Sequence, residues 1–271
     1  MSHTKLCSRP IKGLILDIAG VLKDGDIAIP GSVEAVAKLQ AAGFPFRLVT
    51  NETLKTKKVI TKTLNMLGFR TTEREMFSPI PAIVEILKKE KLRPHLLLHP
   101  NVLPEFKDLD MENPNCVVVG DAEECFTYET LNESFRKLME MEDPKLFSLG
   151  IGKYYMDDDG LALDVGSFCK GLEYATGVKA RIVGKPSSDY FLAAVDDLGL
   201  KPEEVVMVGD DIEFDVNGAQ QCGMRGVLVR TGKFRKTDES HPRVMPDAIV
   251  DNLLHAIELV LNSVQNFKHK I

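Results

Sequence analysis

The stretch GLILDIAGVL, residues 13–22, decides how the rest of the sequence is interpreted. Residues 13–18 form an apolar run broken only by Asp17, which predicts a short buried strand. An aspartate at a strand end is most often a helix cap or a turn residue. A functional role for Asp17 must therefore be judged from the polar residues that reach the same edge of the sheet.

Strand and helix patterns alternate on both sides of a long middle segment. We predict strands over residues 13–18, 46–49, 181–183, 205–208, 226–229 and 248–250. Helices are predicted over residues 30–42, 54–67, 188–198 and 252–261. This alternation is typical of parallel βαβ units. We therefore expect an α/β fold with a doubly wound parallel-sheet core.

The middle of the chain contains a second set of alternating elements. Strands are predicted over residues 95–98, 116–119 and 147–149, helices over 83–90, 131–141 and 168–175, and a turn over 157–160. We interpret residues 81–183 as an inserted α/β cap domain. The core would then be discontinuous, made of residues 1–80 and 184–271.

Four polar signals follow predicted strands: Asp17, Thr50 with Asn51, Lys185, and Asp210 with Asp211. In an open parallel sheet, ligands bind beyond the carboxyl ends of the strands, so sites far apart in sequence can meet at one edge. Each signal alone has an ordinary explanation as a cap, a turn former, a loop charge or a helix start. Their common placement favours a functional site instead.

Phosphoryl transfer needs this set of residue types. A carboxylate such as Asp17 can attack phosphorus and form an aspartyl-phosphate intermediate. A cation must then bridge the carboxylate and the anionic phosphoryl group, and Mg²⁺ prefers carboxylate and carbonyl oxygens, which Asp17 and Asp210 can supply. Lys185, Thr50 and Asn51 suit the task of holding the phosphoryl oxygens.

Four segments resemble the four motifs of the haloacid dehalogenase superfamily: residues 13–22, 49–52, 183–186, and 208–211 with Asp215. The insert resembles the large α/β cap, called C2, of the NagD-like branch of this superfamily. The resemblance implies a phosphatase with Mg²⁺ bound by Asp17, the Ala19 carbonyl and Asp210. Asp211 or Asp215 would assist nearby.

The resemblance also implies which residues contact the substrate: Asp17, Ile18, Ala19, Thr50, Asn51 and Lys185. Asp17 and Lys185 would be the catalytic residues. Further segments, at residues 113–118, 152–155, 172–175 and 229–235, resemble phosphatases that act on inorganic pyrophosphate and on N-phosphorylated lysine and histidine. By that resemblance we expect a homodimer in the cytoplasm and also in the nucleus.

Ala19 departs from the usual pattern, in which a second aspartate stands two residues after the nucleophile. That aspartate protonates the leaving oxygen and later activates water, and losing such catalysis costs about 10²–10⁴-fold in rate. A metal-bound phosphate leaving from pyrophosphate, or a phosphoramidate protonated on its own nitrogen, needs less help. We therefore hypothesise a preference for P–O–P and P–N bonds over simple monoesters.

Composition limits the other possibilities. A net charge of −6 argues against a general nucleic-acid surface, and no apolar run is long enough to span a bilayer. The five scattered cysteines fit reduced thiols in the cytosol, without a metal-binding or redox pair.

Three alternatives stay open at this point. A receiver domain uses similar residues, but its acidic pair precedes the acceptor aspartate, whereas here Asp17 comes first and Asp210-Asp211 come last. The chain could also be a related hydrolase with another phosphoester specificity. Finally, Ala19 could mark a catalytically weak phosphate-binding protein.

Overall fold

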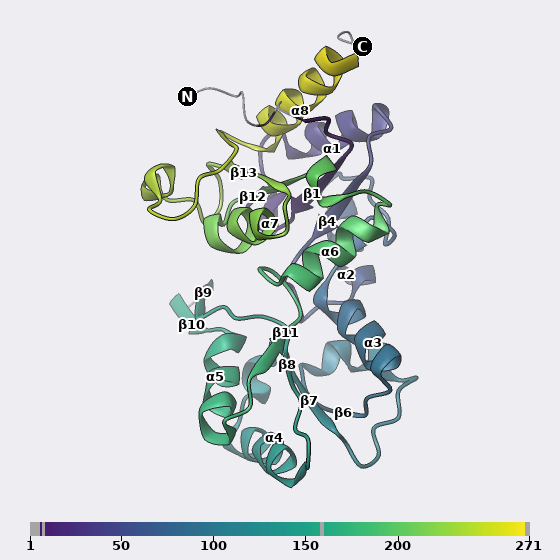
Figure 1. The fold of residues 1–271 in the computed structure, drawn as a ribbon, viewed down its shortest axis with the longest axis vertical. Helices are drawn as coiled ribbons and strands as arrows, with labels where there is room; N and C mark the ends of the chain where they lie inside the picture. Colours follow the sequence, from purple (N-terminus) through teal and green to yellow (C-terminus); the bar gives the residue numbers. More distant parts are fainter. Residues whose placement is uncertain (1–5, 7–8, 158–159, 269–271) are drawn as a thin grey trace. The chain divides into compact units, whose positions relative to one another are not determined.

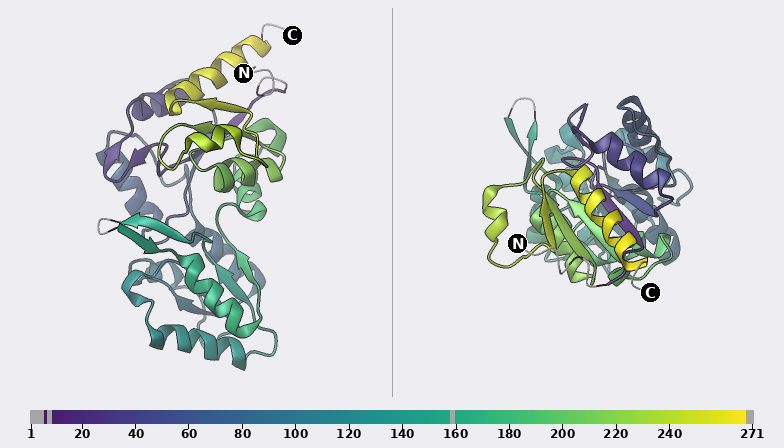
Figure 2. Two further views of the ribbon diagram at one scale, coloured as in Figure 1. Left: turned by 90° about the vertical axis from the view of Figure 1, so that its left-hand side faces the viewer. Right: turned by 90° about the horizontal axis from the view of Figure 1, so that it is seen from above.

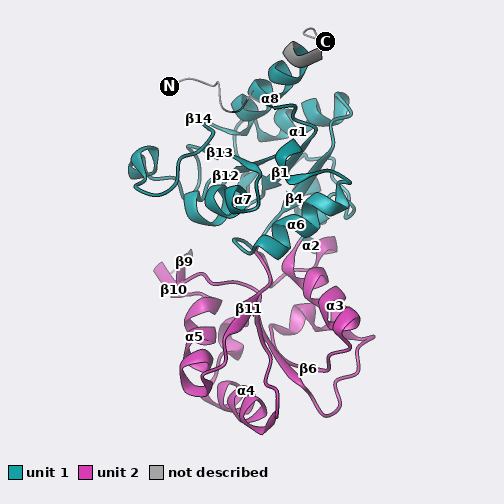
Figure 3. Cartoon of the chain, in the orientation of Figure 1, with its two compact units in different colours: residues 1–50, 59–77, 185–271 teal, residues 51–58, 78–184 magenta. Residues whose placement is uncertain are grey.

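The computed structural model describes residue 6 and residues 9–157 and 160–268 (Figure 1). The chain divides into two compact units, which are described separately below (Figure 3). Unit 1 consists of residues 1–50, 59–77 and 185–271, and unit 2 of residues 51–58 and 78–184. The chain thus leaves unit 1 twice, after residues 50 and 77, and returns for good at residue 185.

Unit 1 is built on a six-stranded sheet in which every neighbouring pair is parallel. The strands, in spatial order, are β14 (Ala248–Val250), β13 (Arg225–Val229), β12 (Val205–Gly209), β1 (Gly13–Asp17), β4 (Phe46–Val49) and β5 (Met76–Phe77). The chain progresses outward from β1 to β5 on one side and from β12 to β14 on the other. The order therefore reverses between β1 and β12, which is where doubly wound sheets bind ligands. The predicted fold class is confirmed.

Helices cover both faces of this sheet (Figure 2). Helices α1 (Ser32–Ala41), α2 (Lys57–Met66) and α8 (Leu253–Lys268) share one hydrophobic core with Leu14 and Leu16 of β1. The opposite face carries α6 (Ser188–Asp197), α7 (Gly218–Gln221) and the π-helix η4 (Ile212–Asn217). Alternate residues of each strand point to opposite faces, so strands covered on both sides are apolar throughout.

Unit 2 repeats the layered plan on a smaller scale. Its parallel strands, in spatial order, are β11 (Ala180–Ile182), β8 (Leu146–Ser148), β7 (Cys116–Val119) and β6 (Pro94–Leu97). Val118 packs with α3 (Pro79–Glu90) and the 3₁₀ helix η1 (Pro100–Phe106) on one side. Val117 and Val119 pack with α4 (Tyr128–Glu140) and α5 (Val165–Thr176) on the other.

The remaining elements are short pieces that the sequence patterns did not predict. Two antiparallel hairpins pair β2 (Lys23–Asp24) with β3 (Ile27–Ala28), and β9 (Tyr154–Asp157) with β10 (Gly160–Leu163). The predicted turn at 157–160 includes residues 158–159, which lie outside the described residues. Three 3₁₀ helices complete the set: η2 (Glu123–Cys125), η3 (Pro202–Glu204) and η5 (Lys236–Ser240).

Two further observations concern the described residues as a whole. None of their helices combines the length and the apolar character needed to cross a membrane. Four cysteines are described, Cys116, Cys125, Cys169 and Cys222, and all four are free thiols.

Candidate active site

Two aspartates lie at the point where the strand order of unit 1 reverses. Asp17 is the last residue of β1, and Asp210 directly follows the neighbouring strand β12. Both residues are buried, with exposed fractions of 6% and 2%. The Oδ1 atom of Asp17 accepts a hydrogen bond of 2.7 Å from the backbone N–H of Ile18. The first carboxylate is thus oriented by its own strand end.

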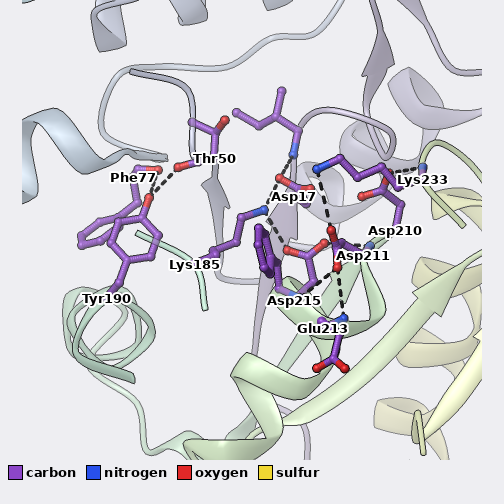
Figure 4. A network of polar contacts seen from close by, with 12 residues as sticks. Asp17, Thr50, Phe77, Lys185, Tyr190, Asp210, Asp211, Glu213, Asp215 and Lys233 are labelled. Carbon is purple, nitrogen blue, oxygen red and sulfur yellow. Dashed lines mark hydrogen bonds and ion pairs between the residues drawn. The ribbon is translucent and has the colours of Figure 1, made fainter. Parts of the chain in front are cut away.

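Lys185 brings a buried positive charge to these carboxylates (Figure 4). Its Nζ atom lies 2.6 Å from Oδ1 of Asp17 and 2.7 Å from Oδ1 of Asp215. Burial disfavours the charged ammonium, but the two carboxylates outweigh burial and hold the pKa of Lys185 above its ordinary value. Lys185 is therefore a permanent cation in this site.

Three carboxylates, those of Asp17, Asp210 and Asp215, each place an oxygen within 4.8 Å of the others. Burial, followed by repulsion from Asp17, raises the pKa of Asp210 to about 8 and that of Asp215 to about 7. One ammonium cannot balance three carboxylates once Asp210 and Asp215 have lost their protons, so the deprotonated cluster carries excess negative charge. Closely spaced carboxylate oxygens are the ligand set that Mg²⁺ prefers, and the cluster fits such a cation.

Asp211 caps the short helix that contains Asp215. Its Oδ1 atom accepts hydrogen bonds from the backbone N–H groups of Glu213 at 3.0 Å and Phe214 at 2.9 Å, which caps the π-helix. In return, Oδ2 of Asp215 accepts a 3.1 Å bond from the Asp211 N–H. Asp211 thus supports the site through the backbone, while Asp215 itself joins the three-carboxylate cluster.

Thr50 follows β4 and is buried in unit 1. Its carbonyl accepts a 2.8 Å hydrogen bond from the buried Tyr190 hydroxyl, which also donates to the Phe77 carbonyl at 3.0 Å. Tyr190 therefore ties together the ends of β4 and β5. Asn51 is grouped with unit 2, where its Oδ1 lies 3.0 Å from the position that a Cβ on Gly184 would take.

Ala19 lies in the turn after β1. It is exposed and forms an isolated bridge with Lys23, while the Ile18 carbonyl accepts hydrogen bonds from the N–H groups of Leu22 and Lys23. The methyl side chain cannot transfer a proton. The turn after β1 thus has no acid–base side chain at position 19.

Three residues that shape the site were given no role there from the sequence: Tyr190, and Gly232 and Lys233 of the segment 229–235. Tyr190 lies within helix α6, where nothing in the sequence marks it as functional. The two carbonyls to which its hydroxyl donates, those of Thr50 and Phe77, are distant in sequence. Gly232 and Lys233 follow β13, and the Lys233 N–H donates a 2.7 Å hydrogen bond to Oδ2 of Asp210. The position of Gly232 and Lys233 after a parallel strand was a signal for such a role, because it places a residue at the functional edge of the sheet.

Comparison with known proteins identifies the class. Two family models match the chain, "Haloacid dehalogenase-like hydrolase" over residues 14–112 and "HAD-hyrolase-like" over residues 182–256. Together with the relatives described next, these matches mean that the chain belongs to the haloacid dehalogenase-like hydrolases and is an enzyme of that family.

The chain is also similar to individual named proteins over nearly its whole length. The chain is 52% identical to phospholysine phosphohistidine inorganic pyrophosphate phosphatase from Danio rerio, over 94% of this chain and 96% of the relative. Its identity to the Homo sapiens protein of that name is 50%, over 93% and 94% of the two chains. Haloacid dehalogenase-like hydrolase domain-containing protein 2 from Homo sapiens is 40% identical, over 93% and 97%.

Solved structures show the same fold. A p-nitrophenyl phosphatase from Archaeoglobus fulgidus superposes with a TM-score of 0.86 at 24% identity, covering 92% of this chain and 99% of that one. NagD from E. coli K-12 gives a TM-score of 0.82 at 22% identity, covering 91% and 98%.

Proposed function

We propose that this enzyme is a Mg²⁺-dependent phosphatase that works through an aspartyl-phosphate on Asp17. The observation that carries the proposal is the buried cluster of Asp17, Asp210 and Asp215 around Lys185 at the sheet's reversal point. A carboxylate whose charge is balanced by a fixed ammonium is suited to attack an electrophilic phosphorus. The cluster's excess negative charge explains why a divalent cation would be needed before an anionic substrate can approach.

The chemical steps follow from the residues present. An oxygen of Asp17 attacks phosphorus, the bond from phosphorus to the leaving atom breaks, and that atom keeps the electron pair. Lys185 offsets the charge on the phosphoryl oxygens, which Thr50 also helps to hold. Water then attacks the phosphorus of the aspartyl-phosphate, releasing inorganic phosphate and restoring Asp17. We propose the same oxygen-holding role for Asn51, which follows Thr50 in the family motif.

Asp17 and Asp210 would hold the Mg²⁺, and the nearby oxygen of Asp215 supports a contribution from that residue as well. The Ala19 carbonyl is a further candidate, based on the family pattern. When bound, the cation supplies charge neutralisation for the approaching phosphoryl group and for the leaving oxygen. Asp211 has a different task, since it caps the helix that carries Asp215.

We further propose that the substrates include inorganic pyrophosphate and N-phosphorylated lysine and histidine. The names of the relatives at about half identity support this substrate class. Ala19 supports it independently, because its side chain cannot protonate a leaving alkoxide. Leaving groups of P–O–P and P–N bonds need that protonation less.

Multiple-turnover release of phosphate tests the proposal. Pyrophosphate, a phosphohistidine peptide, phospholysine and a sugar phosphate would be compared with and without Mg²⁺. We expect turnover of the first three only with Mg²⁺, and its loss in Asp17→Asn with the circular dichroism spectrum unchanged. Retained activity in Asp17→Asn would refute the covalent role. A receiver domain would incorporate one phosphate and stop, and a binding protein would release none.

Preferential turnover of the sugar phosphate would support the second candidate, a hydrolase with another phosphoester specificity. The 40% identity to haloacid dehalogenase-like hydrolase domain-containing protein 2 is the observation that favours this candidate. We also propose a homodimer in the cytoplasm and nucleus, on family resemblance. Light scattering of the purified protein and imaging of a tagged protein test these two points.

A further inference from the structure

The segment after β13, residues 231–233, contacts two separate parts of the candidate active site, and we call it the 231–233 loop. The Thr231 hydroxyl donates a 2.5 Å hydrogen bond to the carbonyl of Gly20, next to Ala19. Two residues on, the Lys233 N–H donates a 2.7 Å hydrogen bond to Oδ2 of Asp210, a contact drawn in Figure 4. One short loop thus joins the turn after β1 to the carboxylate after β12.

The backbones of two glycines, Gly20 and Gly232, lie close to the same oxygen of Asp210, Oδ2. A Cβ on Gly20 would lie 1.9 Å from Oδ2, and a Cβ on Gly232 would lie 2.0 Å from it. Both glycines have positive φ, at 78° and 56°, so a side chain there would be strained as well as blocked. A Cβ on Gly232 would also lie only 2.5 Å from the Cα of Gly20. The two backbone turns therefore pack directly on each other, with Oδ2 enclosed between them.

This enclosure distinguishes the two oxygens of Asp210. Oδ2 is occupied by the Lys233 N–H and surrounded by glycine backbone. Oδ1 has neither this N–H nor this glycine backbone against it, so we infer that Oδ1 is the oxygen that Asp210 offers to the cluster with Asp17 and Asp215. A carboxylate held in this way offers a single oxygen in a fixed direction, which suits a cation with a strict octahedral geometry such as Mg²⁺.

We propose that the 231–233 loop is a positioning element for the metal site, with Thr231 fixing the Gly20 carbonyl and the Lys233 N–H orienting Asp210. The inference rests on the proposed Mg²⁺-dependent function but assigns residues outside the four family motifs. Partners that orient metal ligands without touching the metal typically contribute 10–100-fold to metal affinity. Thr231 is the member of the loop that can be tested by a side-chain change, because its hydroxyl can be removed almost isosterically.

The test measures Mg²⁺ binding by titration calorimetry, without substrate, on the full chain. Thr231→Val should raise the dissociation constant for Mg²⁺ roughly tenfold, while Thr231→Ser should restore it to within about twofold because the hydroxyl is kept. In phosphate release, Thr231→Val should raise the half-saturating Mg²⁺ concentration by a similar factor, with kcat largely recovered at saturating Mg²⁺. An unchanged dissociation constant in Thr231→Val would overturn the proposal, as would equal losses in the Val and Ser variants.

Two further variants separate the loop's role from general damage. Thr237→Val, an exposed threonine in the same connection, should bind Mg²⁺ like the parent protein. Lys236→Ala removes an exposed lysine from the same connection and should also leave Mg²⁺ binding unchanged. Weaker binding in either of these two variants would contradict the assignment to residues 231–233. If pyrophosphate is not hydrolysed at all but Thr231→Val still binds Mg²⁺ more weakly, the proposed function fails while this inference stands.

Discussion

At the scale of single residues, the site depends on buried polar groups whose partners are few and specific. Lys185 is 4% exposed and lies between the carboxylates of Asp17 and Asp215. Removing one partner of a buried ionic group leaves the others uncompensated, which costs about 3–5 kcal/mol. Replacing Lys185 should therefore affect both stability and catalysis.

We expect Lys185→Met to lower kcat by about 10²–10³-fold, because a fixed charge is lost at the transferring phosphoryl group. The midpoint of thermal unfolding should also fall. Exposed Lys89 on α3 provides a matched control, and Lys89→Met should change neither quantity. Wild-type kcat in Lys185→Met, measured by phosphate release, would exclude Lys185 from the chemistry.

Tyr190→Phe tests how Thr50 is held. The change removes only the hydroxyl that donates to the carbonyls of Thr50 and Phe77. Losing the hydrogen bonds of this buried hydroxyl should lower the free energy of unfolding in urea by about 1 kcal/mol. Tyr174→Phe is the control, since Tyr174 is 94% exposed. Equal stability of the two variants would mean that the Tyr190 hydrogen bonds contribute nothing.

At the scale of elements, the π-helix η4 determines where Asp215 lies. Asp211 caps the first N–H groups of this element, and loss of such a cap costs about 1 kcal/mol. Asp211→Ala should lower the unfolding free energy by about this amount and should also weaken Mg²⁺ binding, since Asp215 loses its support. Asp211→Asn keeps an acceptor oxygen and should retain both properties. Similar losses in the two variants would show that charge, rather than capping, is the role of Asp211.

Much of the element pattern could be predicted from the sequence. Strands β4, β7 and β14 begin and end at the predicted residues, because short apolar runs between turn formers specify them locally. The π-helix could not be predicted, since residues 212–217 give no periodicity signal and depend on the Asp211 cap and on packing against Gly226. Helix α8 continues to Lys268, beyond the predicted end at residue 261, because no proline or glycine stops it.

In the candidate site too, residues marked by a local sequence pattern could be predicted, whereas contacts between distant segments could not. Asp17, Lys185 and Asp210 could be proposed from their positions after apolar runs, and unit 1 brings these three together. The partners of Tyr190 and the 231–233 loop could not be proposed, because each joins segments more than a hundred residues apart. Such contacts depend on how strands are ordered in the sheet, which no local pattern records.

At the scale of the whole molecule, the buried carboxylates should make stability depend on pH and metal. The pKa of Asp210 is raised to about 8 and that of Asp215 to about 7, from an ordinary value of 3.8. Between about pH 4 and 8 the folded protein therefore binds more protons than the unfolded chain, so its stability without metal should fall as pH rises.

Mg²⁺ should oppose this loss, because it binds the ionised carboxylates of the folded protein only. We expect the increase in unfolding temperature caused by Mg²⁺ to be larger at pH 8 than at pH 6, where protons compete for the same oxygens. Scanning calorimetry at both pH values, with K⁺ at equal ionic strength as the control, measures the difference. An equal increase at both pH values would contradict the assignment of the cation to these carboxylates.

The central claim is that Asp17 carries the phosphoryl group during turnover. Rapid quenching with hydroxylamine during pyrophosphate hydrolysis, followed by mass spectrometry, tests it most directly, because hydroxylamine converts an aspartyl-phosphate into a stable hydroxamate. We predict a hydroxamate at residue 17 that requires both Mg²⁺ and pyrophosphate. Steady phosphate release with an unmodified Asp17, or a hydroxamate at another aspartate instead, would contradict the account.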